Sequence, residues 1–276
     1  MISLSSWRRP PAKRASDTPA PAEPRPRRDH QLEHAIARDA ITIRYQPQIE
    51  PDTGRVVAVE ALARWDGEDG PEALFARAAA CGLSERLSRT VQRRALREVG
   101  QWGGELAHLR LSINLIPEDI VREGYVAWLL DEIAAAGLKP ERVTVELTES
   151  TLIADQPAAA VRLACLRAAG VQIAIDDFGT GYSCLAYLSA LPLDTIKIDR
   201  GLITDLVGGS KDRIVVRALI RLARELGLKV VVEGVESEAQ LVLLQEWGCD
   251  LYQGFLGARA LDEAALTAFV STRLAA

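Results

Sequence analysis

Polar side chains recur at the ends of short apolar runs, where each needs a partner or a function. They are Glu60, Asn114, Glu146, Asp176, Lys197, Glu233 and Gln253. Because an unpaired buried charge is costly, four carboxylates gathered in one place need cations or mutual pairing. Oxygen ligands of this kind suit Mg²⁺ or Mn²⁺ better than zinc. The chain has three histidines, and none follows the later runs, which argues against zinc or Ser-His-Asp chemistry.

The elements that position these residues alternate between two periodicities. Segments with helical spacing separate eight short runs rich in β-branched residues. The predicted strands are Ile41–Gln46, Val56–Trp65, Leu109–Asn114, Arg142–Leu147, Val171–Asp176, Asp194–Ile198, Lys229–Glu233 and Asp250–Gly254. This order predicts an α/β fold, a (β/α)8 TIM-like barrel, with an open doubly wound sheet as the alternative. In such a barrel the strand ends converge, so we expect the polar residues to meet there.

Local patterns agree with this arrangement. Apolar and polar residues alternate along 143–147, which predicts that Glu146 points into the barrel while its neighbours face helices. Ser237 and Gln240 form a predicted capping box at the start of a helix. Several predicted helices end on glycine, as at Gly248.

Charge divides the chain into two parts. Residues 1–28 hold seven basic and two acidic residues, a net charge of +5. Because the whole chain has a net charge of −5, the remainder has a net charge of −10 once that +5 is subtracted. The first part is also rich in proline, and we predict a disordered tail over residues 1–29, followed by one domain over 30–276. The acidic body should repel a nucleic-acid polymer. The tail is expected to be a solvated spacer, or to contact a membrane surface or a partner protein.

The sequence predicts a cytoplasmic protein. It shows neither a secretory signal nor an apolar run of about 20 residues that could span a bilayer. Its four cysteines are far apart and form no CxxC pair, which is typical of reduced thiols. With about 30 residues ahead of the barrel, we expect regulation through expression, oligomerisation or a partner recruited by the tail.

Eight motifs resemble the EAL family of cyclic di-GMP phosphodiesterases, in the order and spacing of that family. The motifs are Tyr45-Gln46-Pro47, Glu60-Ala61-Leu62-Ala63-Arg64-Trp65, Asn114 before Pro117, Glu146-Leu147-Thr148-Glu149-Ser150, Asp176-Asp177-Phe178-Gly179-Thr180-Gly181-Tyr182-Ser183, Lys197-Ile198-Asp199, Glu233-Gly234-Val235-Glu236 and Gln253-Gly254. They span residues 41 to about 262, nearly all of the expected domain.

The resemblance implies a barrel with one antiparallel strand and an enzyme that hydrolyses cyclic di-GMP to linear 5′-pGpG. Two Mg²⁺ or Mn²⁺ ions would support in-line attack by water. The metal ligands implied are Glu60, Asn114, Glu146, Asp176, Asp177 and Glu233. Lys197, Glu233 and Asp177 are the implied catalytic residues, with Lys197 orienting the water.

Substrate and loop contacts are implied in the same way. Gln46, Leu62, Arg64 and Gln253 would bind the substrate, and the planar fork of Arg64 suits a phosphate. Glu149 and Glu236 would support the loop and the site from outside the metal sphere. Glu236 has an alternative role, since an acidic residue also stabilises the start of a helix. In the family, the loop over 178–183 couples the metal site to a dimer interface, so a homodimer is expected.

The chain departs from the family pattern at several positions, although no expected metal ligand is lost. Residues 66–71 are shortened and lack a His-Pro pair, Ile116 and Cys184 replace serines, and Ala260 and Asp262 stand where prolines are usual. These departures concern substrate affinity and loop rigidity. Two alternatives to the enzyme stay open: a receptor that binds cyclic di-GMP with little or no cleavage, and an interaction module.

Overall fold

The computed structural model describes residues 28–66, 70–148, 156–179, 188, 190–209 and 211–274. Several predictions lie outside these residues: most of the basic tail, Glu149, Cys184 and most of the loop over 178–183. They stay predictions.

Eight strands form a closed barrel in chain order. They are β1 (Thr42–Ile49), β2 (Val56–Arg64), β3 (Arg110–Asn114), β4 (Val143–Thr148), β5 (Gln172–Phe178), β6 (Thr195–Ile198), β7 (Lys229–Val232) and β8 (Leu251–Tyr252). Strand β1 runs antiparallel to both β2 and β8, and the other neighbours are parallel. The predicted closed barrel with one antiparallel strand is therefore confirmed, and the open sheet is excluded.

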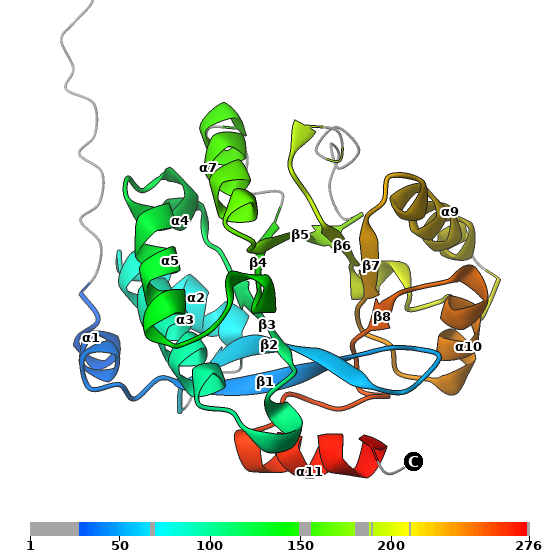
Figure 1. The fold of residues 1–276 in the computed structure, drawn as a ribbon, viewed down its shortest axis with the longest axis horizontal. Coiled ribbons are helices and arrows are strands. Elements are labelled where there is room, and N and C mark those ends of the chain that lie inside the picture. The colour runs from blue at the N-terminus through cyan, green and yellow to red at the C-terminus, as the bar shows by residue number, and fades with distance from the viewer. Residues whose placement is uncertain are drawn as a thin grey trace, which may run out of the picture.

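Helices surround the barrel (Figure 1). The α-helices are α1 (His30–Ala37), α2 (Pro71–Ala80), α3 (Ser84–Gly100), α4 (Pro117–Val121), α5 (Tyr125–Ala135), α7 (Gln156–Ala168), α9 (Lys211–Glu225), α10 (Glu238–Trp247) and α11 (Glu263–Leu274). Short 3-10 helices are η1 (Gly104–Leu106), η2 (Pro140–Arg142) and η3 (Arg200–Leu202). The C-terminal helix α11 contacts β1 and η1, far in sequence from both.

The alternation along β4 places its residues as predicted. Val143, Val145 and Leu147 are completely buried and belong to the hydrophobic core. Thr144 and Glu146 instead line a small cavity inside the barrel. Since successive strand residues point to opposite faces, the same alternation carries polar side chains into the interior from each strand.

Helix ends follow the local sequence signals. In α10 the Ser237 hydroxyl accepts a hydrogen bond from the Gln240 N–H, and the Gln240 side chain accepts one from the Ser237 N–H, so the predicted capping box is confirmed. The same helix ends at Gly248, whose φ of 73° lies in the left-handed region that glycine tolerates best.

Most element boundaries differ from the sequence prediction by one or more residues, among them the start of the domain and the end of β1. Asp29, assigned to the tail, is the N-cap of α1, where its carboxylate accepts hydrogen bonds from the Gln31 and Leu32 N–H groups and from Arg77. The ordered domain therefore begins at least one residue earlier. Strand β1 continues past Gln46 to Ile49, because Pro47 pairs opposite Val59 within the strand. Among the described residues, no helix is long and apolar enough to cross a membrane.

Candidate active site

A buried lysine stands at the centre of the polar residues that the sequence singled out. Lys197, on β6, is 1% exposed and its Nζ contacts four carboxylates. The contacts are Glu146 Oε2 at 2.7 Å, Glu233 Oε1 at 2.7 Å, Asp176 Oδ2 at 3.0 Å and Glu60 Oε2 at 3.3 Å. We call these four residues the carboxylate cluster. One ammonium group thus faces four acidic side chains.

The barrel brings the cluster together from segments far apart in sequence. Glu60 lies on β2, Glu146 on β4 and Asp176 on β5, and Glu233 directly follows β7. Parallel strands of a barrel end on the same rim, so residues near their carboxyl ends become neighbours. Carboxylate oxygens of Glu60, Glu146 and Asp176 lie within 4.8 Å of one another, close enough to share a cation.

Three amide side chains surround Glu60. Asn114 Nδ2 donates to Glu60 Oε1 at 2.9 Å, and Gln253 Nε2 donates to Glu60 Oε2 at 2.8 Å. Gln253 Nε2 also donates to Oε1 of Gln46, which pairs with Glu60 in the β1–β2 register. The buried Oε1 of Gln253 has no hydrogen-bond partner among the described residues. The predicted residues Gln46, Asn114 and Gln253 therefore share one polar surface with the carboxylate cluster.

Close packing holds Gln253 in this position. A Cβ on the following residue, Gly254, would lie 2.2 Å from the Val235 carbonyl oxygen, so only glycine fits there. The backbone of Gln253 bonds on both sides, with its N–H donating to Val232 and its C=O accepting from Val235. The chain after β8 is therefore held close to the chain after β7, where the Gln253 side chain contacts the site.

Burial and mutual repulsion perturb the acid groups of the cluster. Burial, with repulsion from Glu60 and Asp176, raises the pKa of Glu146 to about 8 despite the attraction of Lys197. Burial and repulsion from Asp176 and Glu60 likewise raise the pKa of Glu233 to about 8. Glu60 differs because Lys197 and the two amide donors outweigh its burial and lower its pKa. The metal-free cluster therefore retains protons near neutral pH.

Lys197 stays charged in this environment. Burial acts to lower its pKa, but the four carboxylates around it raise that pKa well above the ordinary value. Since each carboxylate favours the charged amine, the lysine acts as a fixed cation inside the barrel.

Asp177 is turned by an irregular backbone. The β5–β6 register shifts between Ile175 and Phe178, and Asp177 has φ of 54°, in the left-handed region. Its N–H donates to Asp176 Oδ1 at 2.9 Å, and its side chain is exposed. Partial desolvation, then the charges of Asp176 and Asp199, raise the pKa of Asp177. A bulge of this kind re-aims a side chain, here a second aspartate beside the cluster.

Leu62 and Arg64 continue the face of β2 that carries Glu60, because they follow it at steps of two residues. Both side chains are half-buried. The Arg64 guanidinium donates to the Ala63 carbonyl at 2.8 Å, and no ion pair to it is found among the described residues. Arg64 therefore has donors left for a ligand at the carboxyl end of β2.

Glu236 lies outside the carboxylate cluster. It is exposed and directly precedes Ser237, the N-cap of α10, and its N–H donates to Gln240 Oε1. An acidic residue there stabilises the helix, because its negative charge lies near the positive end of the helix dipole. This is the alternative role considered from the sequence.

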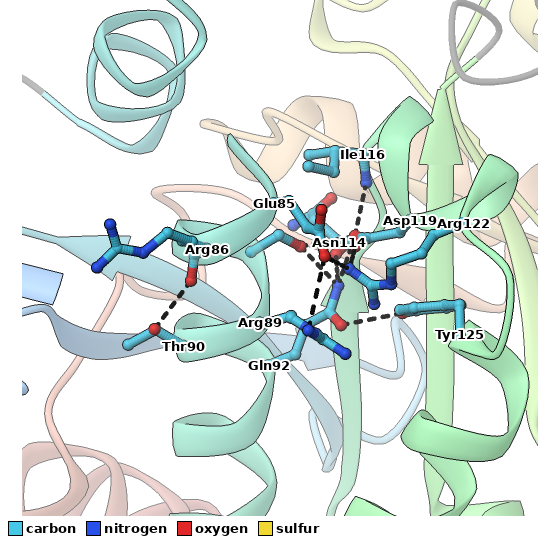
Figure 2. Close-up of polar contacts among 11 residues, drawn as sticks. Glu85, Arg86, Arg89, Thr90, Gln92, Asn114, Ile116, Asp119, Arg122 and Tyr125 are labelled. Carbon is cyan, nitrogen blue, oxygen red and sulfur yellow. Dashed lines mark hydrogen bonds and ion pairs between the residues drawn. The ribbon is translucent and has the colours of Figure 1, made fainter. Parts of the chain in front are cut away.

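Sequence reasoning missed a buried polar network behind Asn114. Gln92 of α3 donates to the Asn114 carbonyl at 3.0 Å and to Asp119 at 3.0 Å, and accepts from the Tyr125 hydroxyl at 2.9 Å. Figure 2 shows the Gln92 amide between these three residues. A signal was present, since Ser84, Ser88 and Gln92 are polar residues spaced four apart on the mostly apolar stripe of α3.

Cavity volume does not mark the site. A cavity of about 790 Å³ lies outside the barrel between α9 and α10 and contains none of the predicted site residues. Its lining includes four arginines: Arg213, Arg217, Arg221 and Arg224. Buried charge identifies the site better, because ionisable groups inside a fold are held there at a cost in stability.

Comparison with known proteins points to one family. The model of the EAL domain matches residues 29–260. A relative in Pseudomonas aeruginosa, the bifunctional diguanylate cyclase/cyclic di-GMP phosphodiesterase MucR, is 38% identical over 247 residues. That match covers 88% of this chain and 36% of MucR. The chain thus spans about a third of the length of this relative.

Two solved structures carry the same likeness. The complex of the MucR phosphodiesterase with c-di-GMP is 38% identical with a TM-score of 0.78, covering 86% of this chain and 99% of that one. The manganese/cyclic di-GMP complex of Klebsiella pneumoniae BlrP1 is 35% identical with a TM-score of 0.74. It covers 80% of this chain and 56% of BlrP1.

Proposed function

The chain belongs to the EAL domain family, and on that premise we propose that it is a metal-dependent phosphodiesterase that hydrolyses cyclic di-GMP to linear 5′-pGpG. The observation that carries the proposal is the carboxylate cluster with Lys197 at its centre, buried at the converging strand ends. Neither a hydrophobic core nor a binding surface needs such a concentration of buried charge.

The residues present fit divalent cations. Four carboxylates face a single ammonium group, and burial together with repulsion between the carboxylates raises the pKa of Glu146 and Glu233 to about 8. The donor set is all oxygen, as Mg²⁺ and Mn²⁺ prefer. Glu60, Asn114, Glu146 and Asp176 would hold the first ion, and Asp176, Asp177 and Glu233 the second. When bound, two such ions neutralise phosphate charge and acidify water.

The protein's own residues divide the remaining work. In the proposed reaction, water attacks phosphorus in line as the bond to the 3′ oxygen breaks. The phosphate stays on the 5′ side, and the released 3′ oxygen takes a proton from bulk water to become a hydroxyl. Lys197 orients the water by hydrogen bonding. Glu233, 2.7 Å from Lys197 at the edge of the cluster, would accept the proton that the water loses. Asp177 would help to position the reacting groups from the solvent-exposed side of the site.

Substrate contacts follow from the rim of β1, β2 and β8. Arg64 would bind a phosphate oxygen through its guanidinium fork. Gln46 and Leu62 would contact the base or sugar, while Gln253 offers its unpartnered Oε1 from the floor of the site. A positive side chain at this rim also offsets the repulsion between an acidic protein and an anionic substrate.

Residues outside the site, the oligomeric state and the basic tail have supporting roles in the proposed function. Glu149 and Glu236 would support the loop and the metal region from outside. We propose that the protein works as a cytoplasmic homodimer, as expected for the family, and that the basic tail serves as a spacer or contacts a membrane surface or partner.

The test is incubation of purified protein with cyclic di-GMP and Mg²⁺ or Mn²⁺, with EDTA controls and chromatographic separation of products. Glu60→Gln removes one cluster charge at constant shape, and Glu132→Gln, on the outer helix α5 where Glu132 pairs with Arg93, is the matched control. We expect pGpG from wild type and Glu132→Gln, only with metal, and intact substrate from Glu60→Gln.

The opposite results separate the alternatives. Intact substrate in every sample would refute the proposed phosphodiesterase activity. Tight binding of cyclic di-GMP under those conditions, measured by calorimetry, would identify a receptor, and the absence of binding would identify an interaction module.

A further inference from the structure

The backbone of Asn114 lacks a strand partner on one side. The β2–β3 register ends at Glu60 opposite Ser112, two residues before Asn114. On the β4 side the ladder continues, since the Leu115 N–H donates to the Glu146 carbonyl at 2.7 Å. A carbonyl left unbonded in the interior would cost free energy, so the Asn114 C=O needs a donor from elsewhere.

Gln92 supplies that donor from α3. It is 1% exposed, and its Nε2 lies 3.0 Å from the Asn114 carbonyl oxygen. The orientation of its amide is determined by its neighbours: Tyr125 O–H donates to Oε1, while the Asp119 carboxylate accepts from Nε2. The two N–H groups of the amide thus serve three acceptors: the Asn114 carbonyl, the Asp119 carboxylate and the Ser88 hydroxyl.

Asp119 ties the same network to the segment that follows Asn114. It is completely buried, and its Oδ2 accepts from the Ser88 hydroxyl at 2.6 Å and from the Ile116 N–H at 3.3 Å. Figure 2 shows the Ile116 N–H directed at this carboxylate. The chain on both sides of Leu115 is therefore bonded to one rigid set of side chains.

We propose that Gln92, held by Asp119 and Tyr125, is a positioning residue for Asn114 as a metal ligand. The inference rests on the proposed function for the ligand role of Asn114. Its side-chain Nδ2 is already committed to Glu60 at 2.9 Å, which leaves Oδ1 for a cation. Because Mg²⁺ demands near-ideal octahedral geometry, a small displacement of the strand end weakens binding.

The chain offers a direct probe of this position, because Asn114 is its sole asparagine and is followed by Leu115. Protein labelled with ¹³C-carbonyl asparagine and ¹⁵N-leucine gives one carbonyl–amide cross-peak. Its carbon shift reports the hydrogen bond from Gln92 to Asn114, and its amide shift reports the bond from Leu115 to Glu146. Titration with Mg²⁺ reads metal binding at the same place without requiring turnover.

The variant is Gln92→Met, which keeps the size of the side chain and removes both the N–H donors and the carbonyl acceptor of its amide. We expect the Asn114 carbonyl signal to move upfield and the Mg²⁺ midpoint to rise about tenfold or more, the range for lost partners of metal ligands. The matched control is Gln245→Met, since Gln245 Nε2 donates to the Pro51 carbonyl at 2.8 Å outside the site. That variant should leave the carbonyl shift and midpoint as in wild type.

Several results would overturn the proposal. They are an unchanged Asn114 carbonyl in folded Gln92→Met, a Mg²⁺ midpoint within twofold of wild type, and equal changes in Gln245→Met. If Gln92→Met does not fold, Tyr125→Phe frees the other end of the amide. A smaller upfield shift and a raised midpoint there support the proposal, and no change in either overturns it.

The same spectra separate this inference from the proposed function. If the wild-type cross-peak does not shift on titration with Mg²⁺, Asn114 is not a metal ligand, and the positioning role of Gln92 is refuted as well. A cross-peak that responds to Mg²⁺ in a protein that leaves cyclic di-GMP intact would refute the activity alone.

Discussion

Adding Mn²⁺ to the metal-free protein should expel protons from the carboxylate cluster, in an amount set by pH. Metal ligands must be deprotonated, so cation binding displaces whatever protons the cluster holds. The pKa of Glu146 and that of Glu233 are each about 8 without metal. At pH 7 each group would then carry about 0.9 proton, and at pH 9 about 0.1. Since the groups interact, the release belongs to the cluster as a whole.

The expected release is therefore roughly one to two protons per protein at pH 7, falling to a few tenths at pH 9. Calorimetric titration in buffers of different ionisation enthalpy measures it directly. Glu233→Gln should lower the release at pH 7 by about one proton. Asp29→Asn, at the N-cap of α1 and outside the site, is the control and should not change it.

The reasoning would be refuted by Mn²⁺ binding with no proton release at pH 7, or with a release that stays constant to pH 9. Either result would mean that the carboxylates are ionised before metal binds. Lys197 would then neutralise the cluster more completely than its geometry suggests.

Four further outcomes can be checked. Without metal, the acids with raised pKa hold more protons when folded than when unfolded, so the melting temperature should fall between pH 6 and 8, and Mg²⁺ should reverse the loss. Lys197→Met should abolish hydrolysis and cost about 3–5 kcal/mol in urea unfolding at pH 8, because it leaves buried carboxylates unpaired. Arg64→Lys should raise KM about tenfold with a smaller change in kcat, because an ammonium group cannot replace the planar fork. Asp29→Ala should cost about 1 kcal/mol of stability at pH 7 with hydrolysis unchanged. Arg77 and the capped N–H groups lower the Asp29 pKa to about 2, so this contribution should disappear from pH 4 towards pH 2.

Most residues of the candidate site could be predicted from the sequence. Glu60, Glu146 and Asp176 stand out because carboxylates rarely occur in apolar β-branched runs, and the alternation along β4 shows which way Glu146 points. Eight such runs separated by helical segments favour a closed barrel, whose strand ends must converge. These inferences depend on local periodicity, which a sequence displays directly.

Only the tertiary structure decided how the site residues affect one another. The pKa of Glu146 depends on Lys197, Glu60 and Asp176, which are brought within a few ångströms from positions far along the chain. The turn of Asp177 comes from a shift in register between β5 and β6. The link from Gln92 to Asn114 exists because β2 and β3 stop pairing before their ends. Burial, charge and missing hydrogen bonds arise from neighbours in space, and local sequence patterns do not contain them.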